Sequence, residues 1–399
     1  MPCSSCDPCD CGCQCANSLV PLNGDASFRR YYRVRLEPEQ CEALCRKEHT
    51  YPHLPERYRS TVITVDAPPE TQKNREFFAI NRLLSHAKVL VPAILCADLE
   101  HGFMVQEDLG DSLFYDVLAD DDERLGFYFR ALVELNKISS LPLTFDAMEA
   151  LTTARQQAQA RHAQGGPDDA VLIARYELDS DDFAYLAQLP PFDDAFIRME
   201  LGIFTQWCLQ EALHLELSAA EQVMLERSFS FLSEACRSQK QVAMHRDFHS
   251  RNIMISPEGC RYCIQAQLAL LDYQDMVVGP IGYDCASLLY DCYYVLASDE
   301  REMLLTQLFK TYQVSGLLEG SCTLEDFKQM VLVCAIQRHI KVLGIFNRLH
   351  LRDGKEGYLQ YLPQVVRYLQ ENCAQVTAMQ DLLAFLDSRV APALLKGAE

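Results

Sequence analysis

The sequence contains no run of apolar residues that matches a membrane span. A transmembrane helix needs about 20 consecutive apolar residues, and no stretch of the 399 residues approaches that length, although apolar residues make up 49% of the chain. The N-terminus also lacks the basic, then apolar, then small-residue order of a secretory signal. We therefore expect a cytoplasmic protein with no membrane partner, whose apolar residues fill one large domain or two lobes.

Positive charge is scarce. The chain has 36 Lys and Arg against 56 Asp and Glu, which gives a net charge of −20. A strongly acidic surface disfavours nucleic acid as the main partner. If an anionic ligand such as a nucleotide binds, metal cations and a local basic patch must counter this field. No internal repeat is present either, and we expect a monomer.

Cysteine, in contrast, is abundant, with 18 residues in the chain. Six of them lie in "CSSCDPCDCGCQC", at positions 3 to 15. Clustered thiolates favour soft metals such as zinc or copper(I), but the stronger zinc signature, two distant C-x₂-C pairs, is missing. We predict that residues 1–16 form a disordered tail, and metal binding by this tail remains the alternative.

Residues 17–111 have the pattern of a small sheet that carries one helix. "LVPLNGDASFRRYYRVRL" (19–36) has apolar or aromatic residues on both sides of an Asn-Gly turn, which predicts a hairpin. "RSTVITVDAPP" (59–69) predicts a third strand, and "VPAILCADLEHGFMVQEDLGD" (91–111) predicts two more, joined at His101-Gly102. The helical spacing of apolar residues within 70–88 predicts a helix between them.

After residue 111 the pattern changes to helices. Amphipathic helices are predicted for 119–139, which opens with acidic residues suited to a helix N-terminus, for 193–217 and for 325–352, whose middle is apolar enough to be buried. Between them, residues 242–291 hold short strands around the polar stretch "HRDFHSRN" (245–252). The domains expected are therefore 17–111 and 112–399.

The polar stretch and the strand after it bring together three groups suited to phosphoryl transfer. Asp247 projects from the loop, Asn252 ends it, and Asp272 terminates the strand "LALLDY". Oxygen ligands from neighbouring strand ends suit Mg²⁺, a hard cation. A further carboxylate can take a proton from an attacking hydroxyl, which is the division of labour in phosphoryl-transfer enzymes. The alternative is a pair of polar turns that cap strands.

Several stretches together resemble the aminoglycoside phosphotransferase and choline kinase branch of the protein-kinase-like fold. Within it, the chain is similar to the bacterial anomeric kinases of N-acetylmuramate and N-acetylglucosamine, which act in cell-wall recycling. The fold class implied is α+β and two-lobed, with a small antiparallel-sheet N-lobe and a larger, mostly helical C-lobe. The stretches are "GDASFRRYYRV" (24–34), "DAPPE" (66–70), "EDLGD" (107–111), "HRDFHSRNIM" (245–254), "LDYQDMVVGPIGYD" (271–284) and "QRHIKVLGIFNRLHLRDGK" (337–355).

The resemblance implies a role for each matching residue. Asp247 resembles the catalytic base, and Asn252 and Asp272 resemble the ligands of Mg²⁺. His249 is expected to brace the loop, and Asp284 to steady it from a helix start. Backbone groups of Glu107 and Leu109 are expected to meet the adenine of ATP.

The sequence departs from the kinase pattern in two ways. The turn "NGDAS" lacks a G-x-G-x-x-G, so phosphate binding would use backbone N–H groups and the Ser27 hydroxyl. The third strand has no Lys, and we predict that Arg29 or Arg30 supplies its charge, with solvated edge charges as the alternative.

The acceptor is expected to be an amino sugar bound in the helical lobe. Glu200 and Trp207 are seven residues apart and so share a helix face; an aromatic face suits a pyranose ring. A cation from a later helix suits a carboxylate on the sugar. The rival functions are phosphorylation of an aminoglycoside or another small alcohol, and non-catalytic nucleotide or metal binding. The acceptor-site candidates are Glu200, Trp207, Asp275, Arg338 and Lys341.

Overall fold

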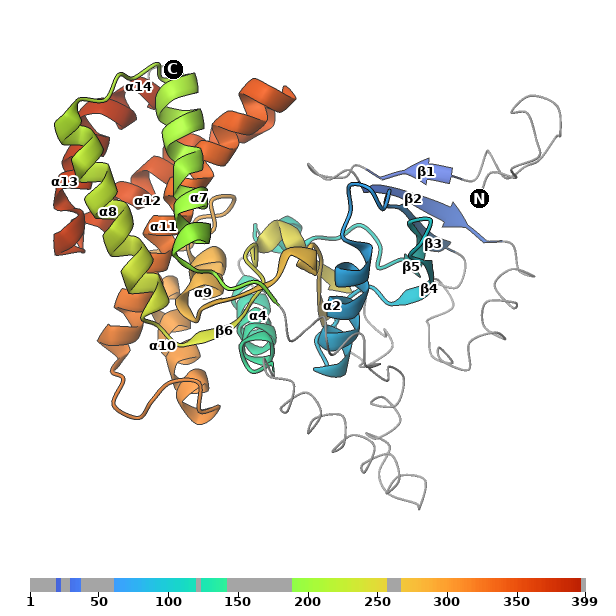
Figure 1. The fold of residues 1–399 in the computed structure, drawn as a ribbon. Helices are drawn as coiled ribbons and strands as arrows, with labels where there is room; N and C mark the ends of the chain where they lie inside the picture. Colours follow the sequence, from blue (N-terminus) through green and yellow to red (C-terminus); the bar gives the residue numbers. More distant parts are fainter. Residues whose placement is uncertain are drawn as a thin grey trace. The chain divides into compact units, whose positions relative to one another are not determined.

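The computed structural model describes six segments of the chain, and contacts divide it into two compact units, each described here by itself (Figure 1). The cysteine-rich tail and Ser27 lie outside the described residues. The first unit comprises Met1–Leu113, Phe145–Leu186 and Met254–Gln274, and the second comprises Phe114–Thr144, Ala187–Ile253 and Asp275–Glu399. The described residues are 19–22, 29–36, 61–119, 123–141, 189–256 and 267–395.

The first unit is built on a five-stranded antiparallel sheet with the order β1-β2-β3-β5-β4. Each strand pairs with a neighbour in the antiparallel sense, as the hairpin and strand patterns predicted. Gly102, between β4 and β5, has φ +78°, and a Cβ there would lie 2.1 Å from the Ala67 oxygen, so glycine is required at this turn. The strands are β1 (Leu19–Pro21), β2 (Arg30–Arg35), β3 (Thr61–Asp66), β4 (Ile94–Asp98) and β5 (Phe103–Glu107).

Helix α2 (Asn74–His86) is the helix predicted between the third and fourth strands. Its apolar residues Phe77, Ile80, Leu83 and Leu84 are all buried. The helix is tied to a distant part of the same unit, because the Asn81 side chain donates to the Tyr273 hydroxyl over 2.6 Å. The ring of Phe77 stacks on Tyr273 with centroids 4.9 Å apart. Tyr273 therefore anchors the segment that follows Asp272 to α2.

A two-stranded sheet, β7 (Ile253–Ser256) with β8 (Gln267–Leu270), joins the first unit. The Leu270 N–H donates to the Leu90 oxygen, and the Ile255 N–H donates to the Ser112 oxygen. Leu90, Leu109 and Ala269 belong to one buried apolar cluster. This packing places the start of the segment containing Asp272 beside the end of the five-stranded sheet.

The second unit is helical. Helix α4 (Arg124–Ser139) and the long helix α11 (Leu324–Asp353) match two predicted helices. The predicted helix 193–217 is shorter: it forms α7 (Asp194–Ile203) and continues as a π-helix, η4 (Phe204–Ala212). Further helices are α3 (Phe114–Val117), α8 (Ala219–Arg237), α9 (Gly282–Leu289), α10 (Ser298–Val314), α12 (Leu362–Ala374), α13 (Gln380–Phe385) and α14 (Ala391–Leu395), with the short 3₁₀ turns η5 (Ser250–Asn252), η7 (Glu356–Tyr361) and η8 (Thr377–Met379) and the π-helix η9 (Leu386–Val390). The 3₁₀ turn η6 (Tyr273–Asp275) begins in the first unit and ends in the second.

Helix α11 is the centre of the second unit. Residues 331–344 are buried without interruption, and α7, η4, α8, α9 and α12 all pack against the helix. Gly344 permits a close approach of α7 and η4, because a Cβ there would lie 2.5 Å from the Ile203 carbonyl carbon and the Phe204 nitrogen. Among the described residues α11 is also the one helix long and apolar enough to cross a membrane, but 83% of its most apolar 18-residue window is buried inside the unit, as in the core helix of a soluble protein.

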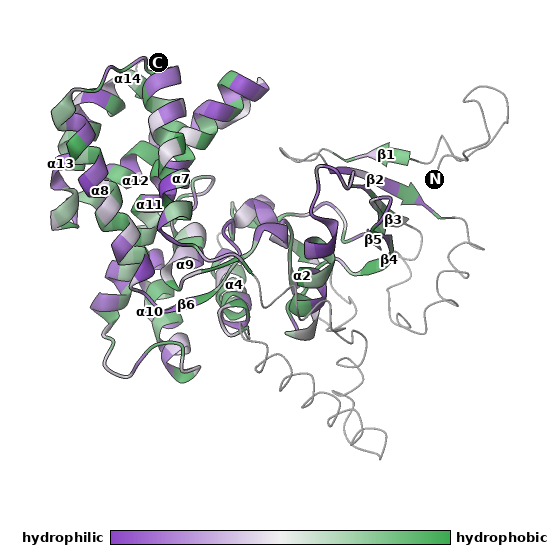
Figure 2. Cartoon of the chain, in the orientation of Figure 1, coloured by the Kyte–Doolittle hydropathy of each residue, from purple (hydrophilic) through white to green (hydrophobic). Residues whose placement is uncertain are grey.

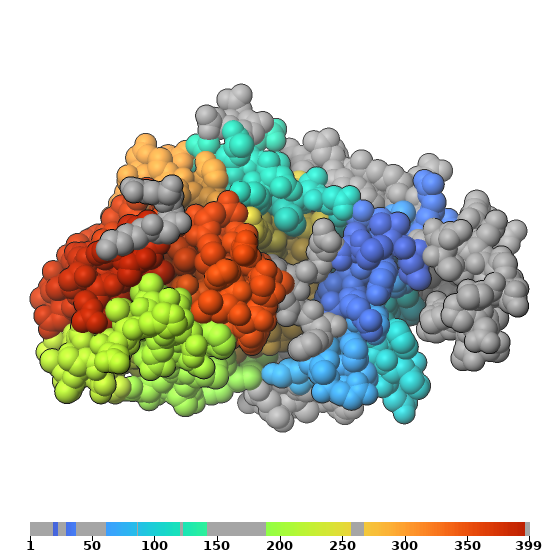
Figure 3. All heavy atoms as spheres, turned by 90° about the horizontal axis from the view of Figure 1, so that it is seen from above, coloured from blue at the N-terminus to red at the C-terminus, as the bar shows by residue number. Residues whose placement is uncertain are grey.

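The outer helices cover α11 with amphipathic faces. Hydrophobic and hydrophilic residues alternate around α8 in Figure 2, and its buried residues Leu225, Phe229, Leu232 and Cys236 recur at helical spacing. The space-filling view shows the yellow-green residues of α8 against the red C-terminal helices, and α13 contacts α8 (Figure 3). The antiparallel-sheet unit and the helical unit confirm the predicted fold class.

A short antiparallel pair, β6 (Gln241–Met244) with β9 (Val277–Pro280), leads into the polar loop. The Met244 side chain packs over Gly279, where a Cβ would lie 2.6 Å from the Met244 sulfur. Strand β6 ends immediately before His245, and α9 begins two residues after β9. The loop 245–252 and the start of α9 are thereby brought together.

Candidate active site

The loop from His245 to Asn252 begins with a strained backbone. Arg246 has φ +77°, a left-handed conformation that costs free energy in a non-glycine residue. Two hydrogen bonds stabilise it: the Asp284 carboxylate accepts from the backbone N–H of His245 over 2.6 Å and of Arg246 over 3.0 Å. Asp284 stands in the first turn of α9. This is the contact expected of a residue that steadies the loop from a helix start.

A second buried carboxylate holds the other end of the loop. Asp291 accepts from the Ser250 N–H over 3.0 Å and from the Ser250 hydroxyl over 2.6 Å. The sequence analysis did not single out Asp291, although it lies seven residues after Asp284 in the same apolar stretch. Together the two carboxylates fix the loop at both ends, so Asp247 projects from a braced segment.

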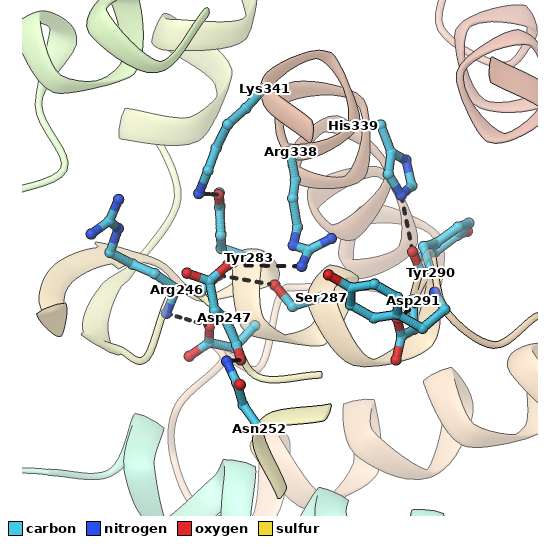
Figure 4. A network of polar contacts seen from close by, with 12 residues as sticks. Arg246, Asp247, Asn252, Tyr283, Ser287, Tyr290, Asp291, Arg338, His339 and Lys341 are labelled. Carbon is cyan, nitrogen blue, oxygen red and sulfur yellow. Dashed lines mark hydrogen bonds and ion pairs between the residues drawn. The ribbon is translucent and has the colours of Figure 1, made fainter. Parts of the chain in front are cut away.

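Asp247 lies among cations (Figure 4). Its Oδ1 is 3.9 Å from the Arg338 guanidinium, and its side chain is 38% exposed. Burial would raise the pKa of Asp247, but Lys341 and Arg338 outweigh burial and lower the pKa well below the ordinary carboxyl value. The carboxylate is therefore ionised at neutral pH, and its exposed fraction leaves it able to meet a hydroxyl group.

The neighbouring carboxylate of Glu200 is fully occupied. Only 1% of its side chain is exposed, and it accepts from Arg246 over 2.8 Å and from Gln337 over 3.1 Å. The Lys341 ammonium lies 3.2 Å from Glu200 and 3.3 Å from the Tyr283 hydroxyl. A buried charge must be paired to be tolerated, and Glu200 supplies that pairing to two cations. Glu200 and Lys341, both expected at the acceptor, are thus bound to each other in the structure.

Trp207 and Asp275 are close in sequence to residues of this cluster, but their surroundings differ from those of Glu200. Trp207 lies in η4 and is half-buried. The prediction that Trp207 shares a helix face with Glu200 assumed the periodicity of an α-helix. In a π-helix the hydrogen bonds run from residue i to i+5, so residues seven apart no longer lie on the same face. Asp275 is exposed, and its backbone oxygen accepts from the Arg246 side chain over 3.4 Å.

His249 and Asn252 complete the loop. His249 is buried against the edge of the Tyr293 ring, and burial lowers the pKa of His249 to about 4, so the ring is neutral. The Asn252 side-chain N–H donates to the backbone oxygen of Asp247 over 3.1 Å, and its backbone N–H donates to the His249 oxygen. With its amide nitrogen engaged, Asn252 keeps its carbonyl oxygen for another partner.

In the first unit, Asp272 also has a strained backbone, with φ +58°. It is exposed, and its carboxylate accepts from the Gln274 side chain over 2.5 Å. Burial raises the pKa of nearby Tyr31, Arg29 lowers it and Asp272 raises it, so both charged groups lie close to the same phenol. Strain of this kind is typical of functional sites.

The three arginines around β2 have different partners. Arg29 is buried, stacks over the Phe77 ring at 4.5 Å and donates to the Lys73 oxygen over 3.3 Å. Arg30 pairs with Asp66 at 2.7 Å, and Arg33 binds Asp108 at 2.6 Å and also Asp111. Arg30 and Arg33 are therefore held by carboxylates, whereas Arg29 lies beside Tyr31 in the neighbourhood of Asp272.

Glu107 and Leu109 lie at the end of the five-stranded sheet. The Glu107 backbone N–H donates to the Ala93 oxygen over 2.8 Å, so that group is used inside the sheet. Leu109 follows the strand, and its side chain packs into the apolar cluster with Leu90 and Met254. The expectation that backbone groups of Glu107 and Leu109 meet adenine stays a prediction.

The side-chain oxygens of Asn252 in the second unit and of Asp272 in the first unit are each of a type that Mg²⁺ accepts. No group of three or more His, Cys, Asp or Glu side chains with metal-binding geometry occurs among the described residues. Mg²⁺ does not need one, because it is commonly held by one or two protein oxygens together with phosphates and water. An amide oxygen and an exposed carboxylate fit that donor chemistry.

Comparison with known proteins finds relatives that match most of the chain. The chain is 29% identical over 356 residues to the N-acetylmuramate/N-acetylglucosamine kinase of Pseudomonas putida, which covers 89% of this chain and 84% of the relative. The kinase of the same name from Pseudomonas aeruginosa is 29% identical over 93% of this chain and 88% of its own. Among solved structures, Plasmodium vivax ethanolamine kinase shares the fold, with 12% identity, a TM-score of 0.51 and coverage of 90% of this chain and 83% of that chain.

Residues 18–320 match the family described as "Phosphotransferase enzyme family". The match runs from β1 through α10, so it covers the first unit and the part of the second unit that precedes α11, and it includes the braced loop and Asp272. A protein that only binds nucleotide or metal is therefore not the best interpretation of these residues. The chain belongs to the phosphotransferase enzyme family.

Proposed function

We propose that the protein is an ATP-dependent kinase that phosphorylates the anomeric hydroxyl of N-acetylmuramate and N-acetylglucosamine. The observation that carries this proposal is the similarity to kinases of that name over about nine-tenths of the chain. Family membership implies a phosphoryl donor, for which ATP is proposed. A place in cell-wall recycling, a cytoplasmic location and a monomeric state belong to the same proposal.

In this proposal Asp247 is the catalytic base. The low pKa of Asp247 makes it a weak base, so it orients the acceptor hydroxyl and accepts its proton late, as the oxygen bonds to phosphorus. An anomeric hydroxyl is more acidic than other sugar hydroxyls and suits such a base. Arg338, 3.9 Å from Asp247, stabilises the carboxylate in its ionised form.

The remaining roles concern the nucleotide and the metal. Asn252 and Asp272 would hold Mg²⁺, which when bound neutralises phosphate charge during transfer. Arg29 supports phosphate binding by its position beside Tyr31, and it is preferred to Arg30, which pairs with Asp66. Ser27, which lies outside the described residues, and the backbone groups of Glu107 and Leu109 stay proposed contacts of ATP. Asp284 and His249 are proposed to brace the loop, and Trp207 and Asp275 to contact the acceptor.

The product tests this function. The purified protein with MgATP and N-acetylglucosamine should yield the sugar 1-phosphate, which phosphorus NMR distinguishes from the 6-phosphate. The methyl glycoside, blocked at C1 but otherwise unchanged, should not be phosphorylated. Formation of a 6-phosphate, or phosphorylation of the glycoside, would contradict anomeric transfer and leave only membership in the family.

A further inference from the structure

Arg251, between the proposed base and Asn252, is held by three tyrosines. Its guanidinium lies over the ring of Tyr293 at 4.1 Å, of Tyr115 at 5.0 Å and of Tyr361 at 5.1 Å. It also donates to the Tyr361 hydroxyl over 2.5 Å. A planar guanidinium can stack on aromatic faces and donate in its plane at the same time, which a lysine ammonium cannot do. We call Tyr115, Tyr293 and Tyr361 the tyrosine clamp.

The tyrosine clamp gathers three separate parts of the second unit. Tyr115 comes from α3, Tyr293 from the connection between α9 and α10, and Tyr361 from η7 after α11. The rings of Tyr293 and Tyr361 meet edge to face at 5.0 Å. So many contacts around one side chain of a short loop indicate that the position of Arg251 is closely defined.

The tyrosine clamp is connected to Asp291, the carboxylate that holds Ser250 of the loop. Asp291, which binds Ser250, also accepts from the Tyr293 N–H over 2.9 Å. The Tyr293 ring in turn meets the His249 ring at 5.1 Å. Three consecutive loop residues, 249 to 251, are thus fixed to the Asp291–Tyr293 segment. The residue that follows them is Asn252, whose own amide reaches back to the Asp247 oxygen.

We propose that Arg251 is a positioning residue, which the tyrosine clamp holds so that the Asn252 amide oxygen is set for a divalent cation. The proposal rests on the proposed function in assigning Asn252 to the metal. Arg251 itself touches neither metal nor substrate in this account. Its removal should let the Asn252 end of the loop move, while the brace by Asp284 keeps the Asp247 end in place.

Binding of Mn²⁺, measured by electron paramagnetic resonance, tests the proposal without turnover. The sample is the full chain with a non-hydrolysable ATP analogue, and binding to the nucleotide alone is subtracted. Arg251→Ala should weaken Mn²⁺ binding by about 10- to 100-fold, the usual effect of removing a residue that orients a metal ligand. Arg251→Lys should also weaken it, because charge without a planar fork does not restore the clamp. Tyr361→Phe should give a smaller loss, since the ring remains.

Arg227→Ala is the matched control, because Arg227 of α8 forms an exposed ion pair with Asp381 of α13. Steady-state kinetics should show the loss for Arg251 variants in kcat and in the Mg²⁺ requirement, with the acceptor KM unchanged. A folded Arg251→Ala that binds Mn²⁺ as tightly as wild type would overturn the proposal. So would a loss confined to the acceptor KM, which would place Arg251 at the sugar.

Tyr361→Phe and Arg251→Lys decide the matter if Arg251→Ala does not fold. If the wild type phosphorylates no amino sugar, the proposed function fails, and the Mn²⁺ measurement still tests the clamp.

Discussion

At the scale of single residues, Asp247 is proposed to act in the chemical step and not in nucleotide binding, so a substitution there should separate the two. Asp247→Asn keeps the size of the side chain and removes the proton acceptor. We expect turnover to fall by about 10² to 10⁴-fold, the usual contribution of a general base, with nucleotide binding retained. Activity assays beside calorimetric titration of the nucleotide check this, and Asp381→Asn, on the exposed pair with Arg227, is the control. Near-normal turnover would mean that Asp247 is not the base.

A buried histidine makes a second prediction at this scale. His339 is buried, donates from Nε2 to the Tyr290 backbone oxygen over 2.9 Å and stacks on Tyr368. Burial lowers the pKa of His339 from 6.5 to about 3. Between these values the unfolded chain binds one more proton than the folded chain, so acid favours unfolding. The contribution of His339 is full above about pH 6.5 and is lost as the pH falls toward 3.

His339→Gln should therefore reduce the loss of stability on acidification. One proton changes the free energy of unfolding by about 1.4 kcal/mol per pH unit, or about 2 kcal/mol from pH 6.5 to 5. Urea unfolding followed by the fluorescence of Trp207, the single tryptophan, measures this in the second unit. The exposed His214, replaced by Asn, is the control. An identical pH dependence in wild type and His339→Gln would disprove the attribution.

At the scale of elements, one close helix contact depends on a glycine. Gly344 of α11 meets the backbone of Ile203 and Phe204, where a Cβ would clash. Gly344→Ala should destabilise the second unit by about 1 to 3 kcal/mol through overpacking. Gly202, one residue before Ile203, has open space around its Cβ position. Gly202→Ala should be neutral or stabilise by up to about 1 kcal/mol, because alanine favours a helix. Equal effects in urea unfolding would refute this explanation.

Elements with strong local patterns were predictable from the sequence, and those without were not. The hairpin strands, α2, α4 and α11 follow from alternation or helical spacing of apolar residues. Helix α8 is missing from the predictions, although Ser218 and Glu221 form a capping box at its start. The π-helix η4 was not predictable, because its register depends on packing against α11 rather than on local residue preference.

The same division holds for the candidate site. Asp247, Asn252 and Asp272 stand in a polar loop and at the end of the strand that follows it, so the local pattern indicates them, and the family resemblance implies Asp284. The pairing of Glu200 with Lys341 and the contact of Asp291 with Ser250 join residues 141 and 41 positions apart. Such pairings arise from tertiary packing and leave no local pattern. Sequence therefore indicated the residues of the loop and Asp284, but neither Asp291 nor the pairing of Glu200 with Lys341.

At the scale of the whole molecule, the cysteine-rich tail is separable from the matched chain. The family match begins at residue 18, after all six clustered cysteines. Deleting residues 1–16 should leave turnover and thermal unfolding unchanged, which a direct comparison with the full chain measures. A shortened chain that folds but has lost activity would show that the cysteines take part in the active protein.

The uninterrupted burial of α11 has a consequence for how the protein unfolds. Gln337, Arg338 and Lys341 stand in the buried span 331–344, so exposing their backbone amides requires the second unit to open as a whole. In hydrogen exchange these amides should be among the slowest, and their rates should follow global unfolding. The cations around Asp247 then persist for as long as the fold does. Heating should accordingly show no stage in which the unit is folded but its charge cluster is disassembled.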